Sequence, residues 1–443
     1  MLPSLSSSRR IRLFAFTAYY AAQGFPIGLL TVAMPAWLAA SGAAAGDVAN
    51  FVAITTLPWG FKLLAGPIMD RFKFPAMGGR RPWVILAQTG LVLTLVAMAL
   101  SNATASDVAL LTWAGFAVNS FAAIQDVAVD GMAIEVLPED ERGRANALMG
   151  FGQVAGYAGS GALCGWGLIA LGLAPTVLMV AMGVGVILAL VIALRERAGE
   201  KLLPWSSGSI QHAEHARLLG MGDIARKLLH VLLLPTSVLM IIVILCWRFA
   251  DGIFITAIPV LLTQELGWSS TEYSNWYANS SFVAAALGVL LGPWIDRHGA
   301  RTYLALGLLG TALAYLALAL GTPLWSSKPF WIAGLFAVNL MVQVVFVSAI
   351  ALHMNLCWSK IAATQFAVYM AWANLSRSIG AKGYGEVAPF LEPGQECLLM
   401  AAVSLLGALL VCLANLSNHA KRLQRLQDAQ PAEELAGDVP AKF

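Results

Sequence analysis

Three ionisable side chains, Lys62, Asp126 and Asp130, lie inside long apolar stretches of this 443-residue chain. A charged group inside a bilayer costs several kcal/mol unless it is paired or hydrated, so these residues are candidates for proton coupling or solute contact. Lys62 precedes Asp70 by eight residues and Asp130 precedes Pro138 by eight, which places both about 12 Å deep in helical geometry. The matching depths predict a Lys62–Asp130 pair, with Asp126 one turn deeper on the same face. The alternative interpretation is a buried structural pair.

A second group of charges lies in the other half of the chain. Arg248 and Asp251 are three residues apart, so they could neutralise each other on one helix. Alternatively, Arg248 anchors an anionic group of a bound solute. Arg377 has no acid within one helical turn, and we therefore expect it to face water or an anion rather than lipid.

Further polar and aromatic side chains occur within the same apolar stretches. Each of them could bridge two packed helices, or the set could line a central cavity. As a set they favour a large amphipathic solute with hydrogen-bonding groups over a bare ion. The predicted cavity residues, beside Arg248, Asp251 and Arg377, are Tyr20, Gln23, Asn119, Gln125, Gln153, Tyr157, Asn339, Gln343, Trp372 and Asn374.

A charged turn occurs twice in the chain, as Gly66-Pro67-Ile68-Met69-Asp70-Arg71 and as Gly292-Pro293-Trp294-Ile295-Asp296-Arg297. Other matches keep the same order at similar offsets: Phe116-Ala117-Val118-Asn119 returns as Phe336-Ala337-Val338-Asn339. Such a pattern indicates a duplicated membrane unit, as in many solute carriers. Basic residues follow both turns and complete the two loops that we expect to control conformational change: Arg80, Arg81 and Arg301.

The duplication also shows that Asp126 and Asp130 occur in only one of the two related halves. In the second half, Phe346 and Ile350 occupy the positions of Asp126 and Asp130. A purely structural feature would tend to recur in both halves. The carboxylates of the first half are therefore expected to serve a specific function.

Composition defines the class of protein. Charged residues make up 12% of the chain and hydrophobic residues 59%, with a mean hydropathy of +0.74, whereas soluble proteins carry about 25% charged residues. The five cysteines show no paired spacing, so neither a disulfide framework nor a metal site is expected. A bilayer needs roughly 20 apolar residues per helix. Such runs lie near residues 13–39, 48–69, 83–101, 108–136, 145–170, 174–194, 234–263, 277–295, 302–321, 330–354, 362–381 and 396–416.

The distribution of Lys and Arg predicts the orientation. With twelve spans, most of the 27 basic residues fall in the two tails and the even-numbered loops, which places both termini in the cytoplasm. The resulting organisation is an all-α membrane protein with two pseudo-symmetric six-helix bundles. The predicted segments are a tail at 1–12, a bundle at 13–194, a linker at 195–230, a bundle at 231–416 and a tail at 417–443.

The two charged turns resemble the signature loop of the major facilitator superfamily, although an insertion from Phe72 to Gly78 precedes the first Gly-Arg-Arg. Three segments resemble the branch of AmpG-type muropeptide permeases and acetyl-CoA transporters: residues 57–67, 125–131 and 137–146. Siderophore permeases of the RhtX/FptX type are similar in the same segments. The resemblance implies alternating access and proton-driven import across a bacterial inner membrane. In the superfamily, the signature aspartate bridges neighbouring helix ends in one of the two rocking states.

These observations favour a proton-coupled importer of a large amphipathic solute such as a muropeptide. The alternatives are a ferri-siderophore importer and, in another class, a membrane-embedded transferase. No nucleotide-binding loop or hydrolase motif occurs in the sequence, so neither an enzyme nor a cofactor is expected. The expected partners are the solute, protons and the lipid bilayer, without nucleic acid, and the expected state is a monomer.

Overall fold

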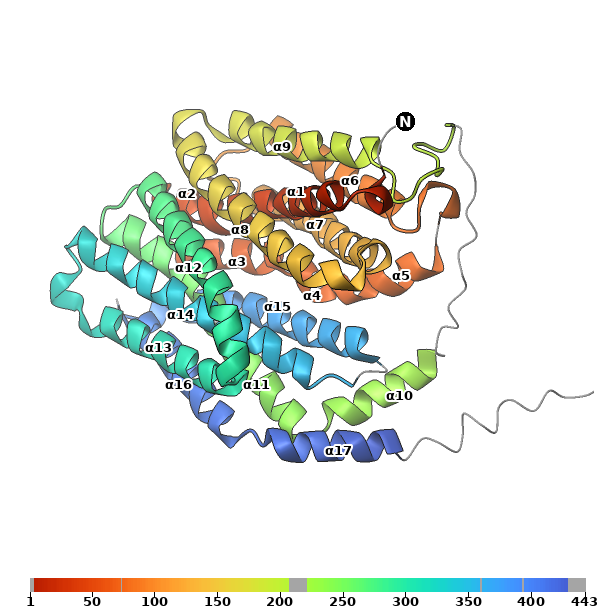
Figure 1. Ribbon diagram of the computed structural model, residues 1–443. Coiled ribbons are helices and arrows are strands. Elements are labelled where there is room, and N and C mark those ends of the chain that lie inside the picture. The colour runs from red at the N-terminus through yellow and green to blue at the C-terminus, as the bar shows by residue number, and fades with distance from the viewer. Residues whose placement is uncertain (1–3, 73, 207–220, 359–360, 393, 429–443) are drawn as a thin grey trace, which may run out of the picture.

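A computed structural model describes residues 4–72, 74–206, 221–358, 361–392 and 394–428 (Figure 1). Within these residues the regular structure is helical, and the long helices form two bundles side by side. One end of the two bundles lies on the side of the molecule where the chain starts. Two shorter helices, α10 (Met221–Leu232) and α17 (Leu416–Asp428), lie on the same side. We call this side of the molecule the terminal end and the opposite side the far end.

The first bundle contains six long helical segments. Its first segment is α1 (Arg9–Gly28), which continues through a π-helical turn into α2 (Met34–Ala40). The second segment is broken into α3 (Ala45–Thr56), α4 (Pro58–Phe61) and α5 (Ala65–Arg71). The remaining four are α6 (Arg81–Leu100), α7 (Val108–Val136), α8 (Glu139–Ala170) and α9 (Leu173–Ala193).

The second bundle has six long segments as well. They are α11 (Pro235–Val260), which runs on through a π-helical turn to Glu265, α12 (Ser270–His298), α13 (Ala300–Leu320), α14 (Lys328–Asn355), α15 (Ala362–Val387) and α16 (Gln395–Leu413). Among the described residues, eight of the twelve long segments are by length and composition apolar enough to cross a membrane. The other four are the α3–α5 segment, which is broken into short helices, and α8, α12 and α15, whose sequences contain more polar residues.

Helix packing repeats between the bundles. The α1–α8 pair corresponds to α11–α15, and α3–α7 corresponds to α12–α14. Likewise α6 packs on α7 and α9, as α13 packs on α14 and α16. The two six-helix bundles predicted from the sequence are therefore confirmed.

Each of the two duplicated loops contains an arginine that hydrogen-bonds to carbonyl groups at the end of a helix. The Arg81 guanidinium donates to the carbonyls of Val191 and Ile192 at 3.0 and 2.6 Å, near the end of α9. Arg301 donates to the carbonyls of Val411 and Cys412 at 3.2 and 2.6 Å, near the end of α16. The last carbonyls of a helix have no partner within the helix. These two arginines therefore cap the last helix of each bundle.

The buried carboxylate of Glu196, at the start of the linker, hydrogen-bonds to the loop that precedes α6. The Glu196 carboxylate accepts hydrogen bonds from the backbone amides of Gly79, Arg80 and Arg81 at 3.0, 2.9 and 2.5 Å. Burial, reinforced by the charge of Glu200, raises the pKa of Glu196 to about 7, although the amide bonds act in the opposite direction. The start of the linker is thus fastened to the first bundle.

Glycines allow α1 and α8 to touch backbone to backbone. A methyl group at Gly156 would lie 2.4 Å from the Ala21 carbonyl oxygen, whereas one at Gly159, on the same helix, would meet nothing within 4 Å. We expect Gly156→Ala to force the helices apart and to cost about 1–3 kcal/mol in free energy of unfolding. Thermal unfolding of the detergent-purified protein checks this, with Gly159→Ala as the matched control. Equal midpoints for the two variants would contradict the close packing.

Candidate functional site

The break in the second helical segment positions Lys62. Pro58 has no amide hydrogen, so α3 ends at Thr56 and a new short helix begins. Lys62 then starts a 3-10 helical turn, Lys62–Leu64. The sequence predicted one continuous span over 48–69, and the structure corrects this prediction. Short 3-10 turns inside a helix often mark functional positions.

Lys62 pairs with Asp126. The Lys62 Nζ lies 2.5 Å from Asp126 Oδ2, and the Asp126 side chain is only 6% exposed. The predicted Lys62–Asp130 pair is therefore wrong. The depth estimate compared only the heights of the helical backbones, and Asp126 lies one turn from Asp130 on the same helix face, so depth alone could not decide between the two acids.

Two glutamines extend this ion pair. Gln23 Nε2 donates to Asp126 Oδ1, and Gln153 Nε2 donates to Gln23 Oε1 at 2.9 Å. The network therefore joins α7 to α1 and α8. It satisfies both carboxylate oxygens of Asp126, as a buried ion pair requires.

Asp130 has a different environment from Asp126. It accepts a hydrogen bond from the Tyr20 hydroxyl and lines a cavity of about 530 Å³ at the terminal end. Lys62, Gly66 and Arg80 also line this cavity, and Arg80 Nε lies 3.1 Å from Glu135. The charges belong to the first bundle. The apolar wall comes from both bundles and includes Val127, Ile134, Leu137, Met149, Phe366, Ala367 and Met370.

The polar residues predicted to line a cavity do not form this wall, and several tie helices together instead. Gln125 Nε2 donates to the Tyr19 carbonyl at 2.9 Å, and Asn119 Nδ2 donates to the Thr55 carbonyl at 2.6 Å. Asn339 occupies the position of Asn119 in the second bundle and donates to Ser280 Oγ at 2.9 Å. These three side chains are buried by helix packing, so the prediction is corrected for them.

Three more of the predicted residues lie elsewhere on the bundles. Tyr157 meets Tyr277 of the second bundle edge-on, with ring centroids 6.3 Å apart. Gln343 packs against Gly288 between α14 and α12. Trp372 is 46% exposed on the surface of α15. None of them contributes to the wall of the cavity described above.

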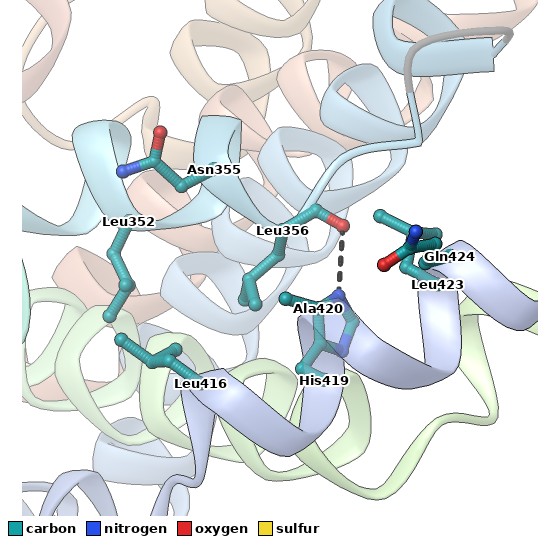
Figure 2. A pocket seen from close by; sticks show the side chains of 8 residues that line it. All are labelled: Leu352, Asn355, Leu356, Leu416, His419, Ala420, Leu423 and Gln424. Atoms are coloured by element: carbon teal, nitrogen blue, oxygen red, sulfur yellow. Dashed lines mark hydrogen bonds between the residues drawn. The ribbon is translucent and has the colours of Figure 1, made fainter.

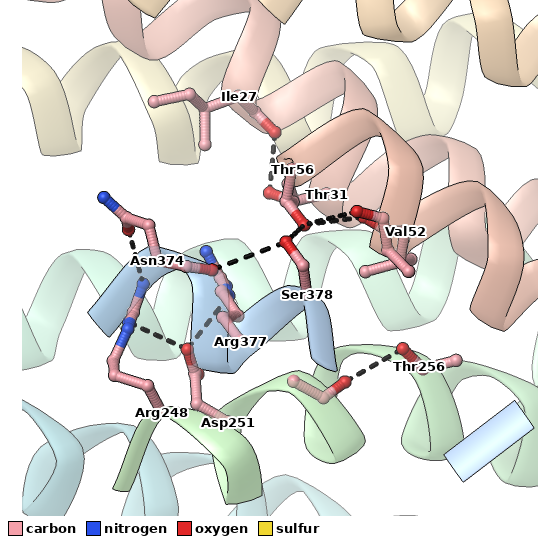
Figure 3. A network of polar contacts seen from close by, with 12 residues as sticks. Ile27, Thr31, Val52, Thr56, Arg248, Asp251, Thr256, Asn374, Arg377 and Ser378 are labelled. Atoms are coloured by element: carbon pink, nitrogen blue, oxygen red, sulfur yellow. Dashed lines mark hydrogen bonds and ion pairs between the residues drawn. The ribbon is translucent and has the colours of Figure 1, made fainter. Parts of the chain in front are cut away.

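In the second bundle, two arginines share one carboxylate (Figure 3). Arg248 Nη1 lies 2.9 Å and Arg377 Nε lies 3.0 Å from Asp251 Oδ2. Arg248 also donates to Asn374 Oδ1 at 3.3 Å. Arg377 was expected to face water or an anion rather than lipid, and the anion that it faces here is the Asp251 carboxylate of a neighbouring helix, which the spacing of residues on its own helix did not reveal.

The two bundles touch along α3–α15 and α8–α12, toward the far end. Across the first contact, Thr56 Oγ1 and Ser378 Oγ are 2.9 Å apart (Figure 3). At the far end, Gln264 Nε2 donates to the carbonyls of Ala39 and Ala43 at 2.8 Å each. The described contacts thus join the bundles at the far end, while the cavity lies between them at the terminal end.

The predicted conformational loops are only partly described. Arg71 and Arg297 are exposed at the ends of their helices. The side chains of Asp70 and Asp296, and the surroundings of Gly292, lie outside the described part of the structure. The bridging role expected of the two aspartates therefore stays a prediction.

A second pocket, of about 360 Å³, lies between α14 and α17 (Figure 2). There His419 Nε2 meets the Leu356 carbonyl at 3.2 Å, and burial lowers the pKa of His419. A neutral imidazole can donate this bond through its Nε2 hydrogen. The pocket lies beneath the second bundle, so it is distinct from the cavity between the bundles.

Two related six-helix bundles around a partly charged cavity define a multi-pass membrane protein built as a solute carrier. Comparison with known families agrees, because residues 13–381 match the Major Facilitator Superfamily. The chain belongs to this superfamily, and it is a transporter rather than an enzyme.

Curated relatives match over shorter segments. The "Anhydromuropeptide permease" of Escherichia coli is 31% identical over 147 residues, which is 33% of this chain and 29% of the relative. The "Putative transporter AmpG 4" of Rickettsia felis is 32% identical over 160 residues, 34% of this chain and 37% of the relative. An uncharacterized protein of Haemophilus influenzae is 31% identical over 157 residues, 33% of this chain and 35% of the relative. The matches thus span about a third of these relatives' lengths.

Proposed function

We propose that this transporter imports a muropeptide-like amphipathic solute together with protons. The observation that carries this proposal is the composition of the cavity between the bundles, which combines Asp130, Lys62 and Arg80 with an extended apolar wall. Such a surface suits a solute with both polar and apolar parts. The names printed for two of the relatives, an anhydromuropeptide permease and an AmpG transporter, support the same solute class.

Asp130 is the proposed proton carrier. Asp126 is held by Lys62 and Gln23, whereas Asp130 borders the cavity and has Tyr20 as its hydrogen-bonding partner. The Tyr20 hydroxyl can donate to the carboxylate and can accept from the protonated acid. Asp130 therefore has both access to solution and a partner in each protonation state.

In this proposal the terminal end faces the cytoplasm. The excess of basic residues in the tails and the even-numbered loops supports that orientation. The cavity is then open toward the cytoplasm, and the far-end contacts close the opposite side. Import follows when the bundles rock about the solute and these contacts separate.

Uptake into proteoliposomes tests the proposed function. The reconstituted protein is given an imposed pH gradient and a labelled N-acetylmuramyl peptide, and a ferri-siderophore is offered in parallel. Accumulation of the peptide that disappears when a protonophore is added supports the proposal. Gradient-driven accumulation of the ferri-siderophore alone would replace muropeptide import with the siderophore alternative, and product formation without a gradient would favour a transferase.

A disulfide across the α3–α15 contact should stop transport. Because the Thr56 and Ser378 hydroxyls are 2.9 Å apart, cysteines at these positions are within reach of each other. We expect the Thr56→Cys/Ser378→Cys double variant, in a background without the native cysteines, to lose at least about nine-tenths of its uptake on oxidation. Reductant should restore uptake, and each single-cysteine variant is the control. Full uptake by the oxidised, cross-linked protein would contradict rocking at this contact.

A further inference from the structure

The arginine cluster of the second bundle carries an excess of positive charge. Two guanidinium groups, of Arg248 and Arg377, face one carboxylate, and both contacts fall on Asp251 Oδ2. Both arginine side chains are mostly buried, at 15% and 17% exposed. A net charge of one cation inside a membrane domain is unfavourable without a counterion.

Hydrogen-bonding capacity remains unused in this cluster. The 3.0 Å contact of Arg377 Nε with Asp251 is an ion pair without hydrogen-bond geometry. Within the described part of the chain, no acceptor forms a hydrogen bond with the rest of the Arg377 guanidinium. A guanidinium has five donors in a planar fork, so Arg377 has donors available for a further anion.

The cluster lies on a helix face that also supplies part of the cavity wall. Phe366 and Met370 line that cavity, and Asn374 and Arg377 follow on α15 at spacings of four and three residues, which places all four on one helix face. Asn374 Nδ2 also donates to the Trp59 carbonyl of the first bundle at 3.3 Å. A solute in the cavity would therefore have the cluster beyond its apolar contacts on α15.

We propose that Arg248 and Arg377 together bind a carboxylate group of the transported solute. This inference rests on the proposed transport function and extends it to the chemistry of the solute. A carboxylate supplies the single negative charge that the cluster lacks, and it matches the planar donors of a guanidinium. The apolar part of the solute then lies against Phe366 and Met370.

A matched pair of probes tests the carboxylate site. One probe is N-acetylmuramoyl-L-alanyl-D-glutamate, and the other is the same molecule with its carboxyl groups converted to amides. Titration calorimetry of the purified protein should show the acid binding about tenfold tighter or more, as expected for a charge-assisted hydrogen bond. Arg377→Gln should remove this preference, and Arg377→Lys should retain part of it.

Two features keep the test independent of folding defects. Arg377→Gln leaves the Arg248–Asp251 pair neutral, so this variant is expected to fold. Lys328→Gln removes a cation from a surface ion pair with Glu272 and should leave the acid preference unchanged. Loss of the preference in Lys328→Gln as well would overturn the assignment to the cluster.

A simple carboxylate separates this inference from the choice of solute. Sodium propionate should raise the thermal midpoint of the wild type above that in sodium chloride of equal ionic strength, and Arg377→Gln should abolish the difference. If the muramyl peptide is not transported but the propionate effect depends on Arg377, the carboxylate site stands and the solute class is wrong. If the acid and its amide bind alike and propionate acts like chloride, the carboxylate site is wrong even where both probes are transported.

Discussion

Asp130→Asn is expected to abolish the accumulation of solute that a proton gradient drives. Exchange of solute across the membrane in the absence of a gradient should continue. An amide has the size of a carboxyl group but cannot take up or release the proton. One proton moving down 100 mV supplies about 2.3 kcal/mol, which corresponds to roughly fiftyfold accumulation. The variant should therefore lower the accumulation ratio from tens to about one. Uptake and counterflow in proteoliposomes measure the two quantities separately.

The control for this prediction is Asp107→Asn. Asp107 lies just before α7, the helix that carries Asp130, and accepts hydrogen bonds from Thr104 in an exposed loop. Its substitution makes the same chemical change outside the cavity and should leave accumulation intact. Wild-type accumulation by Asp130→Asn would exclude this residue as the proton carrier, and Asp126→Asn would then become the next variant to measure.

The overall architecture could be predicted because membrane insertion leaves strong signals in the sequence. Apolar runs of bilayer length gave the twelve segments, and the repeated turns gave the two related halves. The same offset that relates Asn119 to Asn339 also relates Arg81 to Arg301 and the carbonyls that they cap. The sequence shows the repeat of these residue types, whereas the contacts that they make were seen only in the structure.

Partners between helices could not be predicted in the same way. The acid that reaches Arg377 is on α11, and sequence spacing says nothing about rotation of α11 against α15. Lys62 was assigned to Asp130 because only the depths of the two residues were compared, whereas in the structure its amino group contacts Asp126, one turn away on α7. In both cases the tertiary geometry, rather than the spacing along the sequence, determines the partner of the charged residue.

The apolar wall of the cavity was missed for a different reason. Phe366 and Met370 face the cavity, yet in a membrane protein such residues equally suit lipid. Polar residues were favoured as lining, but Asn119 and Gln125 are buried in helix–helix hydrogen bonds. In membrane helices, a polar side chain is as often a hydrogen-bonding contact between packed helices as it is part of a binding surface.

The second large effect concerns the Lys62–Asp126 pair. Each single replacement, Lys62→Gln or Asp126→Asn, leaves one charge buried without its partner. Breaking a buried pair in this way costs about 3–5 kcal/mol, so both single variants should be much less stable in detergent. The double variant should recover most of that loss, because two neutral amides can hydrogen-bond to each other and to Gln23. Thermal or denaturant unfolding of all four proteins gives the coupling energy.

Transport by the double variant then decides between the two interpretations of the pair. If Asp130 is the proton carrier, the Lys62–Asp126 pair mainly holds the broken second segment against α7, and a stable neutral replacement should transport within about tenfold of the wild type. A double variant that is stable but fails to accumulate solute would place the charge of the pair in the coupling step. If the stability lost by the double variant equalled the sum of the losses in the two single variants, the 2.5 Å contact would contribute no coupling energy.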